Sequence, residues 1–173
     1  FSACGLDVVL SNNSSNKIYE SGLRSIMADN ICFPAKLMHG HINNLIDMKV
    51  DRIFYPYVVF ERKEDDKSKN SFNCPIVSAY SDVIKSSMDP ARKSGVPFDA
   101  PVITFNDSEL LVKSCWAYLK TLGVKREVAL KAIEMAKNVQ TSYIQKLTAR
   151  ANEVLDLATK ENRMVILLAG RPY

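Results

Sequence analysis

The sequence predicts an α/β fold: a Rossmann-like parallel sheet flanked by helices, with a long C-terminal helix that leads into the start of a second lobe. Three observations predict it. Short apolar runs alternate with segments of helical periodicity, residues 124–162 contain neither Gly nor Pro, and the apolar run "MVILLAG" follows them. We therefore expect an α/β lobe over residues 1–123, a connecting helix over 124–162 and the first strand of a truncated second lobe over 163–173. On this view the chain is a fragment of a longer protein.

The first third of the chain predicts a strand and two helices. The run "LDVVL" at residues 6–10 is typical of a buried strand, and "KIYESGL" predicts a short helix that ends at Gly22. Residues 34–49 carry apolar side chains at spacings of three and four, and Pro34 suits the first turn of a helix. We therefore expect an amphipathic helix over this segment.

The middle of the chain continues the alternation. The aromatic and branched run "DRIFYPYVVF" predicts a strand that ends near Pro56, and the polar stretch "ERKEDDKSKNSFN" predicts a surface loop. Next come a helix over "CPIVSAYSDVIKSSM" and a strand over "FDAPVITF". The helix over "NDSELLVKSCWAYLKTLG" takes Asn106 or Asp107 as its N-cap and stops at Gly123.

Composition excludes several classes of function. The net charge of +4 is small, and the basic residues are scattered among acidic ones, so we expect no nucleic acid partner. No run of about eighteen apolar residues is present, so we expect no membrane span and a cytoplasmic location. The absence of GxGxxG, GxSxG, HExxH and Walker A sequences argues against a self-contained ATPase or nicotinamide enzyme.

The cysteines fall into two kinds. Cys32 in "CFP" and Cys74 in "CP" each stand just before a predicted helix, where the positive end of the helix dipole favours the thiolate. If their loops converge, the two thiolates form a soft metal site that suits zinc or an iron–sulfur cluster. The alternative is two partly buried free thiols at helix starts. Cys4 and Cys115 are interpreted as small core residues.

Helical spacing separates the two histidines. His41 shares the face of Leu37 at the edge of the apolar stripe, which fits either a hydrogen-bonded boundary histidine or a ligand or acid. His39 lies with Asn43 on the polar side, and we expect it to be solvated. Lys36, in the first turn, either binds an anion such as a phosphate of a CoA thioester or is solvated.

Four ordered motifs give the chain a family resemblance. "CFPAKLMHGH", "IFYPYVVFERKEDD", "NCPIVSAY" and "LLAGRPY" resemble activase-related proteins of the 2-hydroxyacyl-CoA dehydratase system. These are large bacterial proteins in which ATPase activator domains are joined to a region related to the dehydratase subunits. The chain looks like the dehydratase-related region, without the ATPase part.

The resemblance implies a cofactor and partners. Dehydratase subunits hold a 4Fe–4S cluster on cysteines of loops and accept an electron from the activator, whose ATP hydrolysis drives the transfer. By resemblance, Cys32 looks like one ligand and Cys74 like another, while Lys36 and His41 belong to the matching motif and are taken as cofactor-binding residues. The implied partners are an ATPase activator domain, in the same or a separate chain, and an acyl-CoA. We also expect the full-length protein to be an oligomer.

One departure from the family keeps other functions open. Dehydratase subunits have a cysteine near the end of the strand after the first motif, where this sequence has Tyr57. A cluster here then needs a ligand from the missing lobe, from His41, or from a hydroxide or substrate, and we expect the isolated fragment to bind iron poorly. The second hypothesis is a scaffold or interaction domain that has lost the cluster. The third is a cysteine-dependent enzyme that uses Cys32 and His41.

Overall fold

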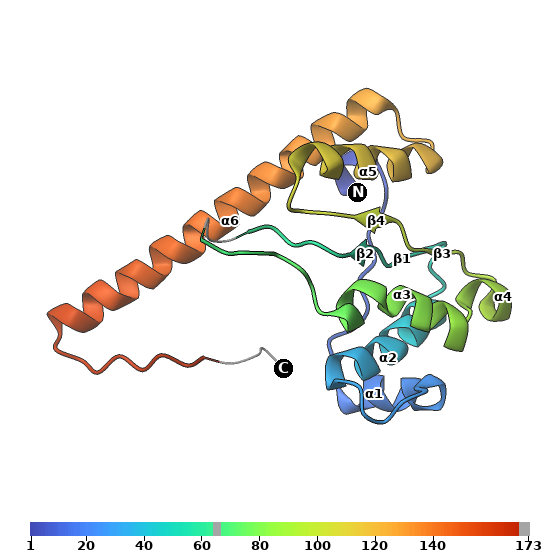
Figure 1. The fold of residues 1–173 in the computed structure, drawn as a ribbon, viewed down its shortest axis with the longest axis horizontal. Helices are drawn as coiled ribbons and strands as arrows, with labels where there is room; N and C mark the ends of the chain where they lie inside the picture. The colour runs from blue at the N-terminus through green and yellow to red at the C-terminus, as the bar shows by residue number, and fades with distance from the viewer. Residues whose placement is uncertain (64–66, 170–173) are drawn as a thin grey trace.

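The computed structural model describes residues 1–63 and 67–169, and it confirms the predicted α/β class. A narrow parallel β ribbon lies between two groups of helices, with α1, α2 and α3 on one side and α5 and α6 on the other (Figure 1). The elements are η1 (Ser2–Cys4), α1 (Asn16–Gly22), η2 (Leu23–Ser25), α2 (Phe33–Asp47), β1 (Ile53–Phe54), β2 (Tyr57–Val58), α3 (Pro75–Ser87), α4 (Pro90–Ser94), β3 (Phe98–Asp99), β4 (Val102–Ile103), α5 (Ser108–Thr121) and α6 (Arg126–Lys160).

The ribbon consists of two short parallel pairs, β1 with β3 and β2 with β4. Both pairs have the same offset along the chain, since Ile53 faces Phe98 and Tyr57 faces Val102. They are therefore two parts of one ladder. The backbone N–H groups of alternate residues, including Ile53 and Tyr57, donate to carbonyls of the neighbouring strand.

The predicted end of a strand near Pro56 agrees with β1, which ends at Phe54, but the prediction missed that pairing continues in β2. Pro56 falls between Tyr55 and Tyr57, whose N–H groups both donate to the neighbouring strand at 2.8 and 2.9 Å. Its missing N–H is therefore on the outer side of the ribbon, where no ladder bond is lost. Strand pairing resumes directly after it.

The main core lies between the ribbon and the helices α2 and α3. Ile42 of α2, Ile53 of β1 and Ile84 of α3 are each almost fully buried and belong to one cluster with Tyr80. Each such side chain stabilises the fold by roughly 1.5–3 kcal/mol relative to exposure in water. This cluster fixes how the starts of α2 and α3 lie relative to each other.

A second cluster joins α5 to the beginning of α6. Leu119, Ala129 and Ile133 are its buried members, and η1 packs against it through Cys4. A carboxylate ties this side to the ribbon: Asp99 of β3 accepts a hydrogen bond from the Tyr118 hydroxyl at 2.8 Å and pairs with Arg52.

Helices α1 and α2 approach each other closely where both contain glycine. A Cβ on Gly40 would overlap the carbonyl of Ile18, and a Cβ on Gly22 would overlap the backbone of Gly40 and His39. The two backbones are therefore in direct contact. As a result, α1 covers the face of α2 that the sequence of α2 predicts to be polar.

Two predicted strands are not formed as expected. Residues 6–10 make no strand; Val8, Val9 and Leu10 are exposed, and the segment runs as a connection from η1 to α1. The apolar run has no adjacent strand to pair with, and this explains the wrong prediction. Residues 163–169 likewise contain no strand. Residues 170–173, the "GRPY" that ends the "LLAGRPY" motif, lie outside the described residues. Their assignment to a second lobe stays a prediction.

The predictions of the long connecting helix and of the helix before it are confirmed. The predicted connecting helix is α6, one continuous helix of 35 residues that extends away from the rest of the fold (Figure 1). Asp107 caps α5, since its carboxylate accepts from the N–H groups of Glu109 and Leu110, and Gly123 follows that helix with a φ of 78°. Among the described residues, no helix has both the length and the apolar character needed to cross a bilayer.

Candidate functional site

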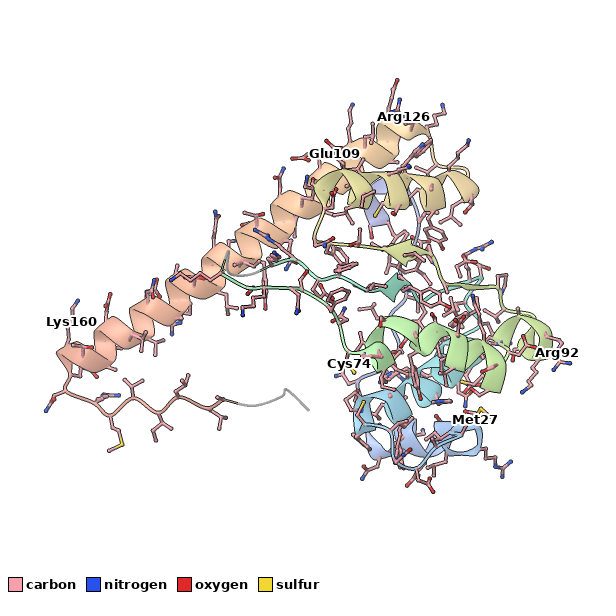
Figure 2. All side chains as sticks on the ribbon, viewed as in Figure 1. Met27, Cys74, Arg92, Glu109, Arg126 and Lys160 are labelled. Carbon is pink, nitrogen blue, oxygen red and sulfur yellow. The ribbon has the colours of Figure 1, made fainter. Side chains whose placement is uncertain are left out.

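Cys32 and Cys74 occupy equivalent positions on neighbouring helices. Cys32 is the N-cap residue of α2 and Cys74 that of α3, and each helix has a proline in its first turn. Both thiols are free and exposed. Figure 2 shows Cys74 at the start of α3, and the sequence-based placement of both cysteines at helix starts is confirmed. No strand precedes Cys32, however, because residues 6–31 form only helical turns and loops.

Tyr80 connects the starts of the two helices. It lies in the second turn of α3 and is buried, and its hydroxyl is 2.9 Å from Nε2 of His39 in the second turn of α2. Burial raises the pKa of Tyr80, and its electrostatic interaction with Cys32 raises it further. The Cys32 thiol is therefore close enough to Tyr80 for its charge to act there.

His39 is not solvated, as its helical position suggested, but fully buried with an exposed fraction of 0%. The sequence-based expectation was wrong because α1 and η2 pack on that side of α2. Its Nδ1 is 2.8 Å from the Ser25 hydroxyl, which closes the network on the other side. Burial lowers the pKa of His39, so the ring is neutral at neutral pH.

Hydrogen-bond counting assigns the protons in this network. The Ser25 hydroxyl donates its one proton to the carbonyl of Gly22 at 2.9 Å. It must therefore accept from His39, which places the His39 proton on Nδ1. Nε2 then carries a lone pair and accepts from the hydroxyl of Tyr80. Every polar atom of the His39 ring is satisfied, and the network holds α2, α3 and η2 in one arrangement.

His41 lies elsewhere on α2. Its Nδ1 is 2.8 Å from the Ser11 hydroxyl and its Nε2 is 3.1 Å from that of Ser14. At about 1.5 Å per residue, His41 is roughly 13 Å along the helix from Cys32. The pKa of His41 is lowered by burial. Both ring nitrogens contact serines, so the geometry does not support a Cys32–His41 catalytic pair.

A cavity of about 290 Å³ adjoins His41 between α2 and β1. Ser11 and His41 supply polar atoms. The other lining side chains are aliphatic or aromatic: Met38, Ile42, Leu45, Ile53, Phe54 and Tyr55. Burial raises the pKa of Tyr55 to about 12, so its phenol is neutral. The cavity offers neutral hydrogen-bonding groups but no fixed charge.

Lys36 folds back onto the loop before its helix. Its ammonium donates to the backbone carbonyl of Asp29 at 2.5 Å, and the side chain is half-buried. The bond fastens the loop that leads into Cys32 to the first turn of α2. An anion at this helix start would have to compete with that carbonyl for the ammonium.

Tyr57 is half-buried in β2. A hydrogen bond to Asp82 of α3 is the main reason that its pKa is raised. The ammonium of Lys85 lies 6.0 Å from the centre of its ring. Because only the phenolate binds metals strongly, the raised pKa makes Tyr57 a poor ligand.

Two thiols would supply only part of the ligands of a 4Fe–4S cluster. A 4Fe–4S cluster takes about four protein ligands, usually thiolates. Within residues 1–63 and 67–169, no group of three or more His, Cys, Asp or Glu side chains is arranged to hold a metal ion. The donor type of Cys32 and Cys74 suits iron, but two thiolates alone would leave such a cluster short of ligands.

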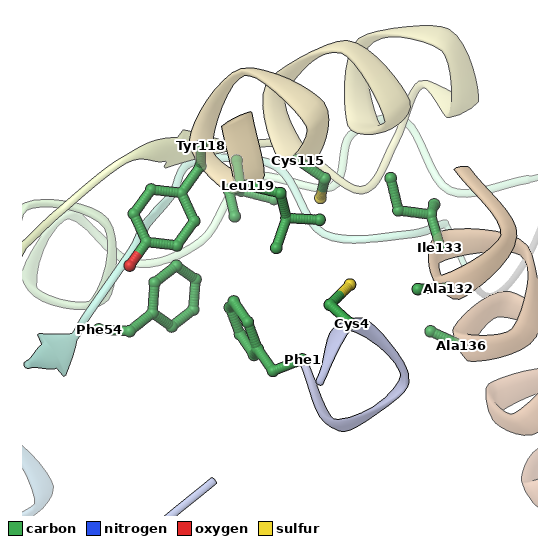
Figure 3. Close-up of a pocket in the computed structure, with 10 residues that line it drawn as sticks. Phe1, Cys4, Phe54, Cys115, Tyr118, Leu119, Ala132, Ile133 and Ala136 are labelled. Carbon is green, nitrogen blue, oxygen red and sulfur yellow. The ribbon is translucent and has the colours of Figure 1, made fainter. Parts of the chain in front are cut away.

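A second cavity, of about 240 Å³, is lined by both of the remaining cysteines (Figure 3). Cys4 of η1 and Cys115 of α5 line it together with aromatic and aliphatic side chains of the ribbon, α5 and α6. Both thiols pack against the second core cluster, and burial raises the pKa of Cys115. The prediction that these cysteines are core residues is confirmed.

Sequence reasoning missed Tyr80 and Ser25, the partners of His39. Tyr80 belongs to the quoted motif "NCPIVSAY", six residues after Cys74, but a tyrosine in an apolar helix face is normally read as core. The available signal was the pair of glycines, Gly22 and Gly40. Glycine inside a helix indicates close packing, and here the packing covers His39.

Comparison with known proteins identifies the family. A family described as CoA enzyme activase uncharacterised domain matches residues 1–173. No curated protein and no solved structure matches the chain. The match confirms a relationship to CoA enzyme activases, while the specific link to the 2-hydroxyacyl-CoA dehydratase system stays a prediction. Since the match spans the whole sequence, the chain belongs to the family of the CoA enzyme activase uncharacterised domain.

Proposed function

We propose that this domain is a dehydratase-subunit-like lobe of a CoA enzyme activase, in which Cys32 and Cys74 hold part of a 4Fe–4S cluster that accepts an electron. One observation carries the proposal. The two exposed cysteines occupy the N-cap positions of neighbouring helices, and the buried contact between His39 and Tyr80 joins the starts of these helices. That contact gives the two thiols a fixed relative position.

The helix starts suit the proposed chemistry. Cys32 and Cys74 are the N-cap residues of α2 and α3, where the helix dipoles favour negative charge. A bound iron–sulfur cluster would supply one-electron transfer. The chain's own residues would hold it and stabilise its charge, with Lys36 fastening the loop before Cys32. We assign His41 to the neighbouring cavity, where it would bind part of a cofactor or acyl-CoA.

The partner would be an ATPase activator domain, in the same or a separate chain. ATP hydrolysis there would drive the electron to this lobe, and an acyl-CoA or another acceptor of low potential would receive it. The missing cluster ligands would come from another lobe of the protein. We also propose a cytoplasmic location, since exposed free thiols such as Cys32 and Cys74 persist in a reducing compartment.

The test is an ATP-dependent absorption change in the full-length protein. It is purified without oxygen, and its visible spectrum is recorded before and after addition of a reductant, first without and then with ATP. We expect a brown protein whose absorption falls only when ATP is present. Cys74→Ala should remove the colour, whereas Cys115→Ala, which changes a core thiol, should keep it. A brown protein whose absorption is the same in both variants would overturn the assignment of the ligands.

A second function has support from Tyr57. Its bond to Asp82 and its raised pKa make it a packing residue rather than a ligand, as expected of a scaffold or interaction domain that has lost the cluster. This alternative predicts a colourless full-length protein that is fully folded and still binds its activator. Tyr57→Cys would then be needed to create iron binding.

A further inference from the structure

The second half of α6 has no partner within the described residues. Apart from Ser142 and Ala158, every residue from 138 to 160 is exposed. Several of these are large apolar residues, and Leu147 is 58% exposed. In Figure 1 this part of the helix extends beyond the ribbon and the other helices.

These apolar residues form a stripe that continues a buried interface. At the start of α6, Ile133 packs against α5. At 3.6 residues per turn, the side chains of Ile144, Leu147, Ala151 and Val154 project within about 60° of the direction of Ile133. The face that α5 covers near residue 133 is therefore the face that stays uncovered from residue 144 onward.

A helix of this kind is not stable alone. Most helical stability in proteins comes from burying an apolar face, and from residue 144 onward this face is uncovered. The spacing of Ile144, Leu147, Ala151, Val154 and Ala158 alternates three and four, the pattern of a coiled-coil seam. The seam indicates another helix as the partner.

We propose that this partner is the same segment of a second copy of the chain, paired antiparallel about a two-fold axis near Ala149. In this register Ile144 faces Val154 of the other copy, and Leu147 faces Ala151. The same alignment places Gln140 opposite Ala158. Each large side chain on the seam thus meets a smaller one, and the contact is the same in both directions, as a two-fold interface requires.

The flanks of the seam fit the same register. Tyr143 lies beside Leu157 of the second copy, so the apolar contact is wider than the seam alone. The two Arg150 side chains meet near the axis, but each is paired with Glu153 of its own helix at 3.0 Å. Their approach therefore brings little like-charge repulsion.

The register also leaves room for the rest of the fold. A two-fold axis near residue 149 places residues 138–160 of one copy alongside the same residues of the second copy, running in the opposite direction. The first part of each α6, from Arg126 to about residue 137, then lies outside the paired segment, where α5 covers it. The proposal does not depend on the iron–sulfur assignment, because Cys32 and Cys74 lie on α2 and α3.

Cross-linking of the full-length protein tests the register. Thr148 of the two copies lies on either side of the axis, so Thr148→Cys should form a 148-to-148 link with a short bis-maleimide. Ala149→Cys is the control: Ala149 is exposed and lies at the level of the axis, but it projects from the face of the helix opposite the seam. Peptide mapping separates these links from any at Cys32 or Cys74. No 148-to-148 link, or a link from residue 148 to another part of the same chain, would overturn the proposal.

A substitution on the seam provides the second test. Leu147→Glu added to Thr148→Cys should reduce the 148-to-148 link at least tenfold, because it places a charge opposite Ala151. Ala149→Glu, on the opposite face of the helix, should leave the link unchanged. Iron content is measured on the same proteins, so loss of pairing is distinguished from loss of a cluster. Equal linking in both variants would contradict the proposed seam.

Discussion

The hydroxyl of Tyr80 donates to Nε2 of His39 across 2.9 Å, and this buried bond joins α3 to α2. The rings also meet edge to face, with centroids 5.7 Å apart. Since Ser25 holds the other side of the His39 ring, neither residue can move without breaking a buried hydrogen bond. The contact thereby sets the relative position of the two helices that begin at Cys32 and Cys74.

Removing the Tyr80 hydroxyl should destabilise the domain. Tyr80→Phe leaves Nε2 of His39 buried without a donor, which costs about 1–3 kcal/mol of unfolding free energy. Urea unfolding followed by circular dichroism measures it. The matched control is Tyr19→Phe, since the Tyr19 ring packs on Phe33 without need of its hydroxyl. Equal losses in both variants would contradict the role of the bond.

Stability should fall as the pH drops below about 6.5. The pKa values of His39 and His41 are lowered by burial in the folded state, whereas the unfolded chain has the ordinary value of 6.5. Below that value the unfolded state takes up protons that the folded state binds less readily, so acid favours unfolding. Above it, this contribution is fully present.

Urea midpoints measured from pH 7.5 to 5.5 test this dependence. The double variant His39→Gln, His41→Gln should show a much flatter profile than the unchanged protein, although its absolute stability will be lower. A slope that persists undiminished in the double variant would assign the effect to other groups.

The close approach of α1 and α2 should not tolerate a methyl group. Gly40→Ala would overlap the carbonyl of Ile18, and we expect a loss of at least about 3 kcal/mol. Gly123→Ala provides the comparison, because Gly123 has a φ of 78° but no neighbour in contact, and its cost should be about 1 kcal/mol. If thermal unfolding finds the reverse order, the packing described for these helices is wrong.

Thiol labelling should separate the four cysteines into two pairs. Cys32 and Cys74 are exposed, whereas Cys4 and Cys115 are partly buried, and the pKa of Cys115 is raised by burial. In the folded, metal-free protein, iodoacetamide should modify the first pair at least tenfold faster, as followed by mass spectrometry of peptides. In urea all four should react at similar rates.

Helix boundaries were predictable because their signals are local. The cysteine-proline pairs marked the starts of α2 and α3, and the carboxylate of Asp107 marked the start of α5. Such signals act within one turn of the chain. The short helix α4 was missed because it is only five residues long and its N-cap residue, Asp89, has a positive φ.

Features that depend on distant neighbours were not predictable. The run at residues 6–10 has the composition of a buried strand, but no strand lies beside it. His39 has the spacing of a solvated residue, but α1 covers it. The network of Ser25, His39 and Tyr80 spans three elements, so no periodicity within α2 indicates it.

The most direct test of the iron–sulfur proposal is the content of iron and acid-labile sulfide. Both are measured in the full-length protein after anaerobic reconstitution, in Cys32→Ala and Cys74→Ala, and in Cys4→Ala as the control. We expect about four irons per site, retained in the control and lost in each of the other two variants. No iron above background in the unchanged protein, or equal iron in all variants, would contradict the proposal and leave the scaffold function in its place.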